Sequence, residues 1–230
     1  MELFPNLQLS ESSFAAYDIE TPVGRVESHV LINDSIVTSE SRQTFDLAIT
    51  GRAVLWRLPV CSIELIVTRP ALIQPYWAQI TDCWAYLWRV QVNEPLDSLE
   101  FVSSLRMREP LSGGPDPGEH LAAQTWDGHH YTISLGTEGG DALYNRAQRN
   151  DWLPQRYLAE ATEWYELPFV EYVPDGLSIK LTSLAAQDLI QAQFVTAWAP
   201  DAGESAAAWS AVDLDARHIL QGAMGQHEWE

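Results

Sequence analysis

Apolar and polar side chains alternate at every second position in several segments of this chain, and this pattern most constrains its fold. The clearest example spans residues 84–92. Its apolar positions are Trp84, Tyr86, Trp88, Val90 and Val92. Successive side chains of a strand point to opposite faces of a sheet, so all five share one face. The opposite face carries Arg89 and Gln91, and we therefore predict that the aromatic face points into the core.

Similar patterns predict more strands in the first hundred residues. Residues 25–30 alternate after a turn signal at residues 21–24, and residues 45–50 alternate up to Gly51. Residues 63–68 are rich in β-branched side chains, and that segment stops just before Pro70, as a strand should. These segments follow one another through turns and not through helices, which favours antiparallel sheets.

The second half of the sequence predicts two hairpins and a further strand. Asp127-Gly128 lies between two strand-like segments and has the composition of a tight type I′ turn, whose two central residues need positive φ. Residues 174–176, Pro-Asp-Gly, separate another pair of strand-like segments. Residues 191–199 form a further apolar segment of strand type.

Helical spacing is confined to three short segments in the same half. The first begins at Asp141, the second at Asp151, and the third covers residues 204–221. Their apolar positions are Leu143 and Ala147; Leu153, Tyr157, Ala161 and Trp164; and Trp209, Val212, Ala216 and Ile219. The fold class that we predict is therefore α+β, mainly antiparallel β and sandwich-like, with a few short helices in the C-terminal half.

Residues 110–118, Pro-Leu-Ser-Gly-Gly-Pro-Asp-Pro-Gly, predict an irregular segment. Long irregular loops in compact domains are either functional lids or linkers. We predict a β-rich part over 1–109, a Pro/Gly loop over 110–119 and an α+β part over 120–230, with one continuous domain as the alternative.

The charge of the chain narrows the classes of partner. Its 32 Asp and Glu residues against 13 Lys and Arg residues give a formal net charge of −19. Nucleic acid and anionic membrane surfaces bind clusters of basic residues. This sequence has no such cluster, so we predict neither as a partner. No apolar segment approaches the roughly 20 residues that span a bilayer. The acidity serves solubility alone, or it steers a partner with a basic surface toward the chain.

The two cysteines, Cys61 and Cys83, lie far apart and lack the spacing of a zinc or redox motif. We predict that both are buried free thiols. The first residues, Met1 to Pro5, have neither a basic segment nor a hydrophobic one, so the sequence shows no secretory signal. The simplest location that fits is a reducing cytoplasm.

Three histidines suggest a centre for metal or acid-base chemistry. His120, His129 and His130 have nearby carboxylates as possible partners, namely Glu119, Asp127 and Glu138. If His129 begins a strand, however, His129 and His130 point to opposite faces, and one metal cannot easily bind both. The sequence also lacks the serine-nucleophile, phosphate-loop and dinucleotide motifs. We predict no metal, no cofactor and no catalytic residue.

Glutamates recur every three residues in the second predicted helix, at Glu160, Glu163 and Glu166. On a helix they would form an acidic edge, which we predict as the partner-binding surface. We expect a non-catalytic protein-binding factor of the bacterial cytoplasm: an inhibitor, an immunity protein or an accessory subunit. Two other classes stay open, namely a hydrolase or metal-dependent enzyme centred on residues 120–130 and a small-ligand or carbohydrate-binding module that uses exposed tryptophans.

Overall fold

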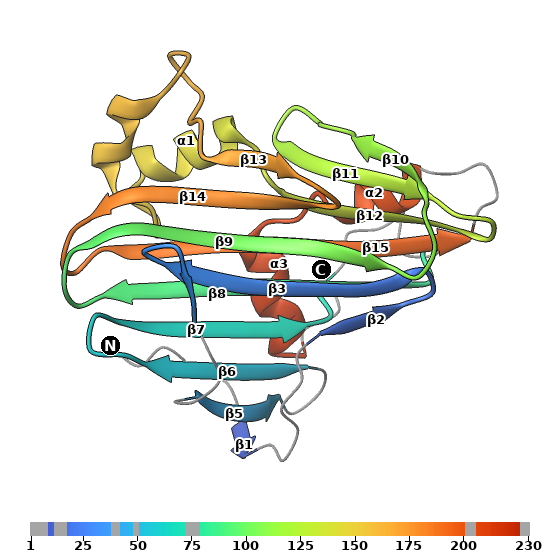
Figure 1. The fold of residues 1–230 in the computed structure, drawn as a ribbon, viewed down its shortest axis with the longest axis horizontal. Helices are drawn as coiled ribbons and strands as arrows, with labels where there is room; N and C mark the ends of the chain where they lie inside the picture. The colour runs from blue at the N-terminus through green and yellow to red at the C-terminus, as the bar shows by residue number, and fades with distance from the viewer. Residues whose placement is uncertain are drawn as a thin grey trace.

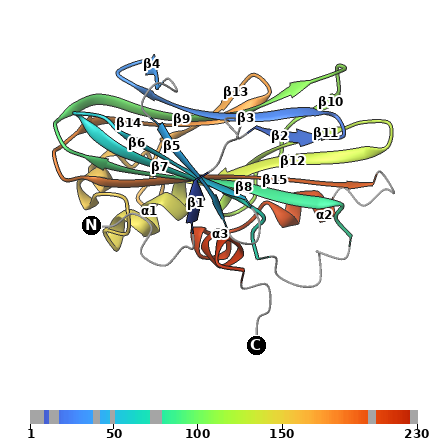
Figure 2. The same ribbon diagram turned by 90° about the horizontal axis from the view of Figure 1, so that it is seen from below.

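Two antiparallel sheets face each other, and short helices cover the outer face of the larger one (Figures 1 and 2). The computed structural model describes residues 9–11, 18–37, 42–47, 51–71, 79–200 and 206–225. Figure 2 shows the layers in order: the small sheet, the large sheet, then helices α2 and α3. The prediction of a mainly antiparallel, sandwich-like fold with a few short helices is confirmed.

The large sheet has nine strands and the small sheet has six. In spatial order the large sheet contains β1 (Leu9–Glu11), β5 (Arg42–Leu47), β6 (Arg52–Arg57), β7 (Cys61–Thr68), β8 (Asp82–Val92), β15 (Leu189–Pro200), β12 (Tyr131–Glu138), β11 (Leu121–Asp127) and β10 (Ser112–Pro115). The small sheet contains β13 (Val170–Val173), β14 (Gly176–Leu184), β9 (Leu96–Met107), β3 (Gly24–Ile32) and β2 (Ile19–Thr21), and β4 (Ser35–Ile36) pairs with β3. The helices are α1 (Gly140–Gln148), a 3₁₀ helix over Gln155–Glu160, α2 (Ala206–Ala211) and α3 (Ala216–Ala223).

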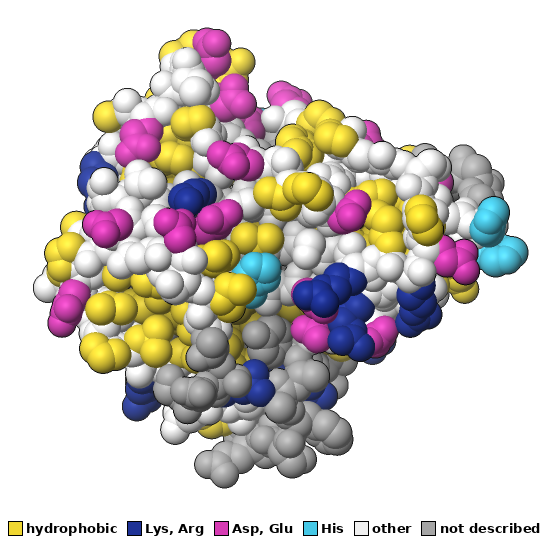
Figure 3. Space-filling view, viewed as in Figure 1, with side chains coloured by type: hydrophobic (Ala, Val, Ile, Leu, Met, Phe, Trp, Pro, Cys, Tyr) yellow, Lys and Arg dark blue, Asp and Glu magenta, His cyan; other side chains and the backbone are white. Residues whose placement is uncertain are grey.

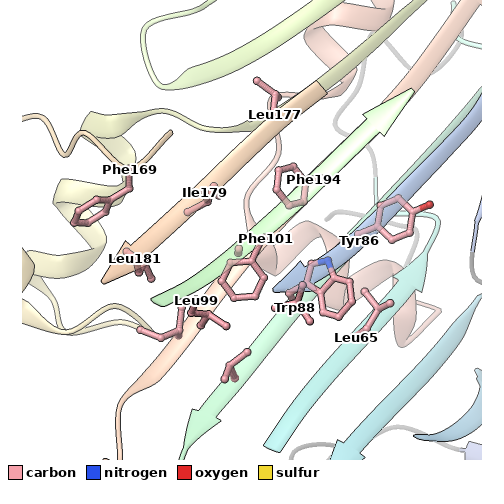
Figure 4. Close-up of a cluster of buried hydrophobic side chains, with 14 of the residues drawn as sticks. Leu65, Tyr86, Trp88, Leu99, Phe101, Phe169, Leu177, Ile179, Leu181 and Phe194 are labelled. Carbon is pink, nitrogen blue, oxygen red and sulfur yellow. The ribbon is translucent and has the colours of Figure 1, made fainter. Parts of the chain in front are cut away.

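The aromatic face of β8 points into the space between the two sheets, as predicted (Figure 4). Trp88 is 1% exposed, and its ring stacks on that of Trp56 with 5.8 Å between centroids. Its Nε1 donates a hydrogen bond to Ser28 Oγ in the small sheet at 2.9 Å, and the Tyr86 hydroxyl donates to Val26 O at 2.8 Å. The aromatic residues therefore join the two sheets by both packing and hydrogen bonds.

The opposite face of β8 is also covered over much of its length. Cys83, Ala85 and Leu87 pack with residues of α2 and α3 in a second core. The single helix predicted over 204–221 is wrong in one respect, because the described part of this segment forms two helices. Asp215 separates them, since its side chain accepts hydrogen bonds from the backbone N–H groups of Arg217 and His218 and so begins α3.

A buried carboxylate lies on this outer face of the large sheet. Glu64 is fully buried, and neither of its carboxylate oxygens has a hydrogen-bond partner among the described residues. Its ion-pair partner is Arg89, with 3.7 Å between Arg89 Nη1 and Glu64 Oε2. Burial raises the pKa of the Glu64 carboxyl to about 7, against the lowering effect of Arg89.

Two turn predictions differ in outcome. The 174–176 signal is confirmed, because Val173 pairs with Gly176 and Asp175 has a φ of 56°. The hairpin near Asp127 forms, but the predicted type I′ turn is wrong. Asp127 pairs with Thr132 inside the ladder, its Oδ1 accepts a hydrogen bond from Thr132 Oγ1, and the turn falls on the residues that follow it.

The 110–119 segment contains regular structure, contrary to the prediction of an entirely irregular loop. Four of its residues form β10, which pairs with β11 at the edge of the large sheet. Strands from before and after this segment occur together in both sheets. The division of the chain into two parts stays a prediction.

Candidate functional site

An open groove of about 830 Å³ lies beside α1. Its walls are the residues that lead into β11, one side of α1, a turn near residue 165 and the strand β13. All of its lining residues fall between Pro117 and Tyr172. The groove contains residues from each of the three functional classes that the sequence left open, namely Glu166, His120 and Trp164.

The turn near residue 165 replaces the second half of the predicted helix, which is the main correction to the sequence analysis. The 3₁₀ helix ends at Glu160, and Ala161 has already left the helical conformation, with φ −57° and ψ 129°. Glu163 and Glu166 then pair as an antiparallel bridge, with Trp164 at the tip between them. We call residues 161–167 the tryptophan turn.

Long-range contacts explain why the helix stops. The buried Tyr157 donates a hydrogen bond to Thr182 O at 2.9 Å, and its ring meets that of Phe169 at 5.2 Å. Leu167 N donates to Gly140 O at 3.1 Å, which ties the tryptophan turn to α1. A Cβ on Gly140 would lie 2.5 Å from Leu167 O, so this close approach requires glycine. A helix continued to Glu166 would break these contacts.

Exposed aromatic side chains gather in the groove. Trp164 is 79% exposed, Tyr165 is 43% exposed and Tyr172 is 41% exposed. They are three of the five large hydrophobic side chains that are exposed in the described residues. The rings of Trp164 and Tyr165 meet edge to face, with centroids 4.7 Å apart. Isolated exposed hydrophobic residues are ordinary, but a gathered set indicates a binding surface.

The charged groups of the groove are mostly acidic. Glu119, Asp141 and Glu166 line it, and its described lining includes neither lysine nor arginine. In Figure 3 acidic and hydrophobic side chains lie side by side at the upper left, over the segment between α1 and β13. The groove therefore combines aromatic faces with negative charge.

The three glutamates of the predicted acidic edge are all exposed, but they do not share one face of a helix. Glu160 ends the 3₁₀ helix, and Glu163 and Glu166 face each other across the tryptophan turn. Of the three, only Glu166 lines the groove. Like charges at three-residue spacing disfavour a helix, which agrees with the turn that forms here.

His120 acquires a partner that the sequence did not predict. Its Nδ1 pairs with Asp141 Oδ2 across the start of β11 and the first turn of α1. The hydrogen bond and the charge of Asp141 raise the pKa of His120. Asp141 was expected to cap its helix, but Gly139 occupies the N-cap position and Asp141 lies in the first turn. The two residues are 21 positions apart, so no local pattern could join them.

The structure separates the three histidines of the alternative site. His120 precedes β11 and His129 follows it, so seven strand residues lie between them, or roughly 23 Å at roughly 3.3 Å per residue. His129 and His130 are exposed in the hairpin turn and do not begin a strand. Glu138 pairs instead with the buried Arg146. Within the described ranges, no three His, Cys, Asp or Glu side chains are grouped as a metal site.

No known family model matches the sequence, and no curated protein matches it. Among solved structures the fold is similar to that of a putative kojibiose phosphorylase from human microbiome, with a TM-score of 0.49 and 7% sequence identity. The match covers 92% of this chain and 30% of that protein. Among the described helices, none has the length and apolar character needed to cross a membrane.

Proposed function

We propose that the chain is a non-catalytic protein-binding factor, and that it holds a basic segment of a partner protein in the groove beside α1. The observation that carries this proposal is the combination of Trp164, Tyr165 and Tyr172 with carboxylates in a groove whose described lining lacks lysine and arginine. An inhibitor, an immunity protein or an accessory subunit would each use such a surface.

The chemistry of the groove suits arginine and lysine side chains. Aromatic faces attract guanidinium and ammonium groups, and carboxylates form charge-assisted hydrogen bonds with them. Tryptophan and tyrosine are enriched among the residues that contribute most to protein interfaces. The net charge of −19 steers a basic partner toward the chain and repels an acidic one.

The groove offers less support for a hydrolase that uses a serine, threonine, cysteine or lysine nucleophile. Its described lining includes no serine, threonine, cysteine or lysine that His120 could activate as a nucleophile. The same lining is compatible with a sugar ligand, because aromatic rings and amide side chains also bind sugars. The negative charge favours a basic peptide over a neutral sugar, and this difference can be tested directly.

The test uses short labelled peptides and fluorescence anisotropy. In the first peptide arginine alternates with threonine, and in the second each arginine is replaced by the uncharged, nearly isosteric citrulline. We expect the arginine peptide to bind, its affinity to fall as salt rises, and the citrulline peptide to bind at least about tenfold more weakly. Equal affinity for the two peptides would contradict the proposal. So would an affinity for the arginine peptide that does not change with salt.

Matched variants localise the binding. Trp164→Ala and Glu166→Gln should each weaken binding of the arginine peptide, whereas Met224→Ala and Glu94→Gln, at exposed positions outside the groove lining, should not. A neutral glucose oligomer serves as the competing ligand. If it binds in a Trp164-dependent way and the arginine peptide does not, the chain is a carbohydrate-binding module instead.

A further inference from the structure

We infer that the partner's segment binds as an added β-strand along the free edge of β13. This inference rests on the proposed function and specifies the conformation in which the basic segment is held. β13 is the terminal strand of the small sheet, next to β14 (Figure 1). The strand borders the groove, because the side chains of Val170 and Tyr172, which share one face of β13, are both lining residues.

The register of the β13–β14 hairpin shows which backbone groups are free. Lys180 N donates to Phe169 O, and Val173 pairs with Gly176 across the two-residue turn. Hydrogen-bonded and non-bonded positions alternate along an antiparallel pair. The N–H and C=O groups of Phe169, Glu171 and Val173 therefore point toward β14, and those of Val170 and Tyr172 point to the free edge.

The turn end of this hairpin is fixed to the large sheet. Gln124 Nε2, from β11, donates hydrogen bonds to Val173 O at 3.0 Å and to Gly176 O at 2.7 Å. Both oxygens belong to the pair that closes the hairpin, so these bonds do not use the free edge of β13. Val170 and Tyr172 are therefore the positions at which an incoming strand would pair.

The two edges that flank the groove region differ in how they discourage pairing. The edge strand β10 reads Ser-Gly-Gly-Pro, and its proline cannot donate a ladder hydrogen bond. β13 reads Val-Glu-Tyr-Val, which contains no proline, glycine or lysine. Every residue of β13 can therefore offer a backbone N–H, and its single charge, Glu171, disfavours an acidic strand but not a basic one.

Charge complementarity identifies the occupant of the edge. Glu171 lies in β13 between the two free positions and is exposed, while Glu119 and Glu166 lie within the groove. Opposite charges on neighbouring strands favour pairing, and like charges oppose it. An extended basic segment thus fits both the backbone and the side chains of this edge, and a second copy of this acidic edge does not.

Backbone-methylated peptides test this inference separately from the proposed function. In one version of the arginine–threonine peptide every threonine amide is N-methylated, and in the other every arginine amide is. An added strand directs alternate amides toward β13, so one version should bind at least about tenfold more weakly and the other should bind like the parent. If the parent binds and both versions bind equally well or equally poorly, the added strand is excluded and the proposed function stands. If the parent does not bind, the proposed function fails.

Two measurements on the protein complete the test. Tyr172→Ala removes the ring and keeps the N–H, while Tyr172→Pro removes both, so the proline variant should bind the parent peptide several-fold more weakly than the alanine variant. Amide hydrogen exchange of the wild-type chain avoids any effect on folding. The amides of Val170 and Tyr172 should gain protection when the peptide is added, and that of Glu171, already directed toward β14, should not. Unchanged exchange at Val170 and Tyr172 in a saturated complex would overturn the inference.

Discussion

The aromatic face of β8 and the tryptophan turn contain the same residue types, but these side chains are buried in β8 and exposed in the turn. In β8, Trp88 is 1% exposed and its ring nitrogen is hydrogen-bonded to Ser28 in the facing sheet. In the turn, Trp164 is 79% exposed, and its ring meets that of the neighbouring Tyr165 edge to face. The number of neighbours that the fold supplies, and not the residue type, decides whether a tryptophan stabilises the chain or is left for a partner.

The largest expected effect tests the buried half of this comparison. Trp88→Ala should lower the free energy of unfolding by about 3–5 kcal/mol, because it removes a large buried side chain and leaves a cavity between the sheets. Urea denaturation followed by circular dichroism measures this change. A loss below about 1 kcal/mol would mean that the two sheets do not depend on the aromatic face of β8.

The second prediction concerns the buried carboxylate on the outer face of the large sheet. The pKa of Glu64 is about 7 in the folded chain and about 4.5 in the unfolded chain, so the folded state binds the extra proton between these values. The free energy of unfolding should therefore fall as the pH rises from about 4.5 to 7, by about 3 kcal/mol relative to Glu64→Gln.

Denaturation of both chains at several pH values checks this prediction. The difference between wild type and Glu64→Gln should change with pH inside that window and level off above it. The exposed Glu94→Gln is the matched control, and its difference from wild type should stay nearly constant. If the difference in unfolding free energy between wild type and Glu64→Gln also stays constant, the environment of the Glu64 carboxylate is more polar than its burial indicates.

The third prediction tests how the tryptophan turn is held. Gly140→Ala places a Cβ 2.5 Å from Leu167 O, and should lower the free energy of unfolding by about 1–3 kcal/mol. It should also weaken the binding of the arginine peptide, because the turn must shift away from α1. Gly114→Ala is the control, since a Cβ there meets nothing within 4 Å. Equal stability of the two variants would show that the turn is not tied to α1.

The smallest expected effect on stability completes the comparison. Trp164→Ala should change the free energy of unfolding by no more than about 0.5 kcal/mol, because the side chain is mostly in contact with water. The same variant should lose most of its affinity for the arginine peptide. A loss of stability close to that of Trp88→Ala would show that Trp164 is a structural residue in solution.

The same two regions show how far the sequence could predict the structure. Trp88 was placed correctly because alternation along a strand is a local signal and β8 is buried on its aromatic face. Trp164 was placed on the wrong element because the helix ends through contacts with distant residues. Tyr157 is hydrogen-bonded to Thr182, and Leu167 is hydrogen-bonded to Gly140. The residue pattern around Tyr157 and Leu167 does not indicate either contact.

The candidate site was predictable only in parts. Exposed glutamates could be read from their spacing, and Glu166 does line the groove. The pairing of His120 with Asp141, and the union of both with Trp164, depends on how β11, α1 and the tryptophan turn meet in space. That meeting is a property of the tertiary structure, so the residues appeared in the sequence as three unrelated possibilities.

The position of the groove along the chain has a consequence for inheritance. All of its lining residues lie between Pro117 and Tyr172, while Trp88 and most of its buried neighbours lie outside that stretch. One recombination event that replaced this stretch would exchange the whole lining of the groove at once. The stretch also contains β11 and β12 of the large sheet, so such a replacement would preserve the sandwich only if it supplied two strands with the same buried faces.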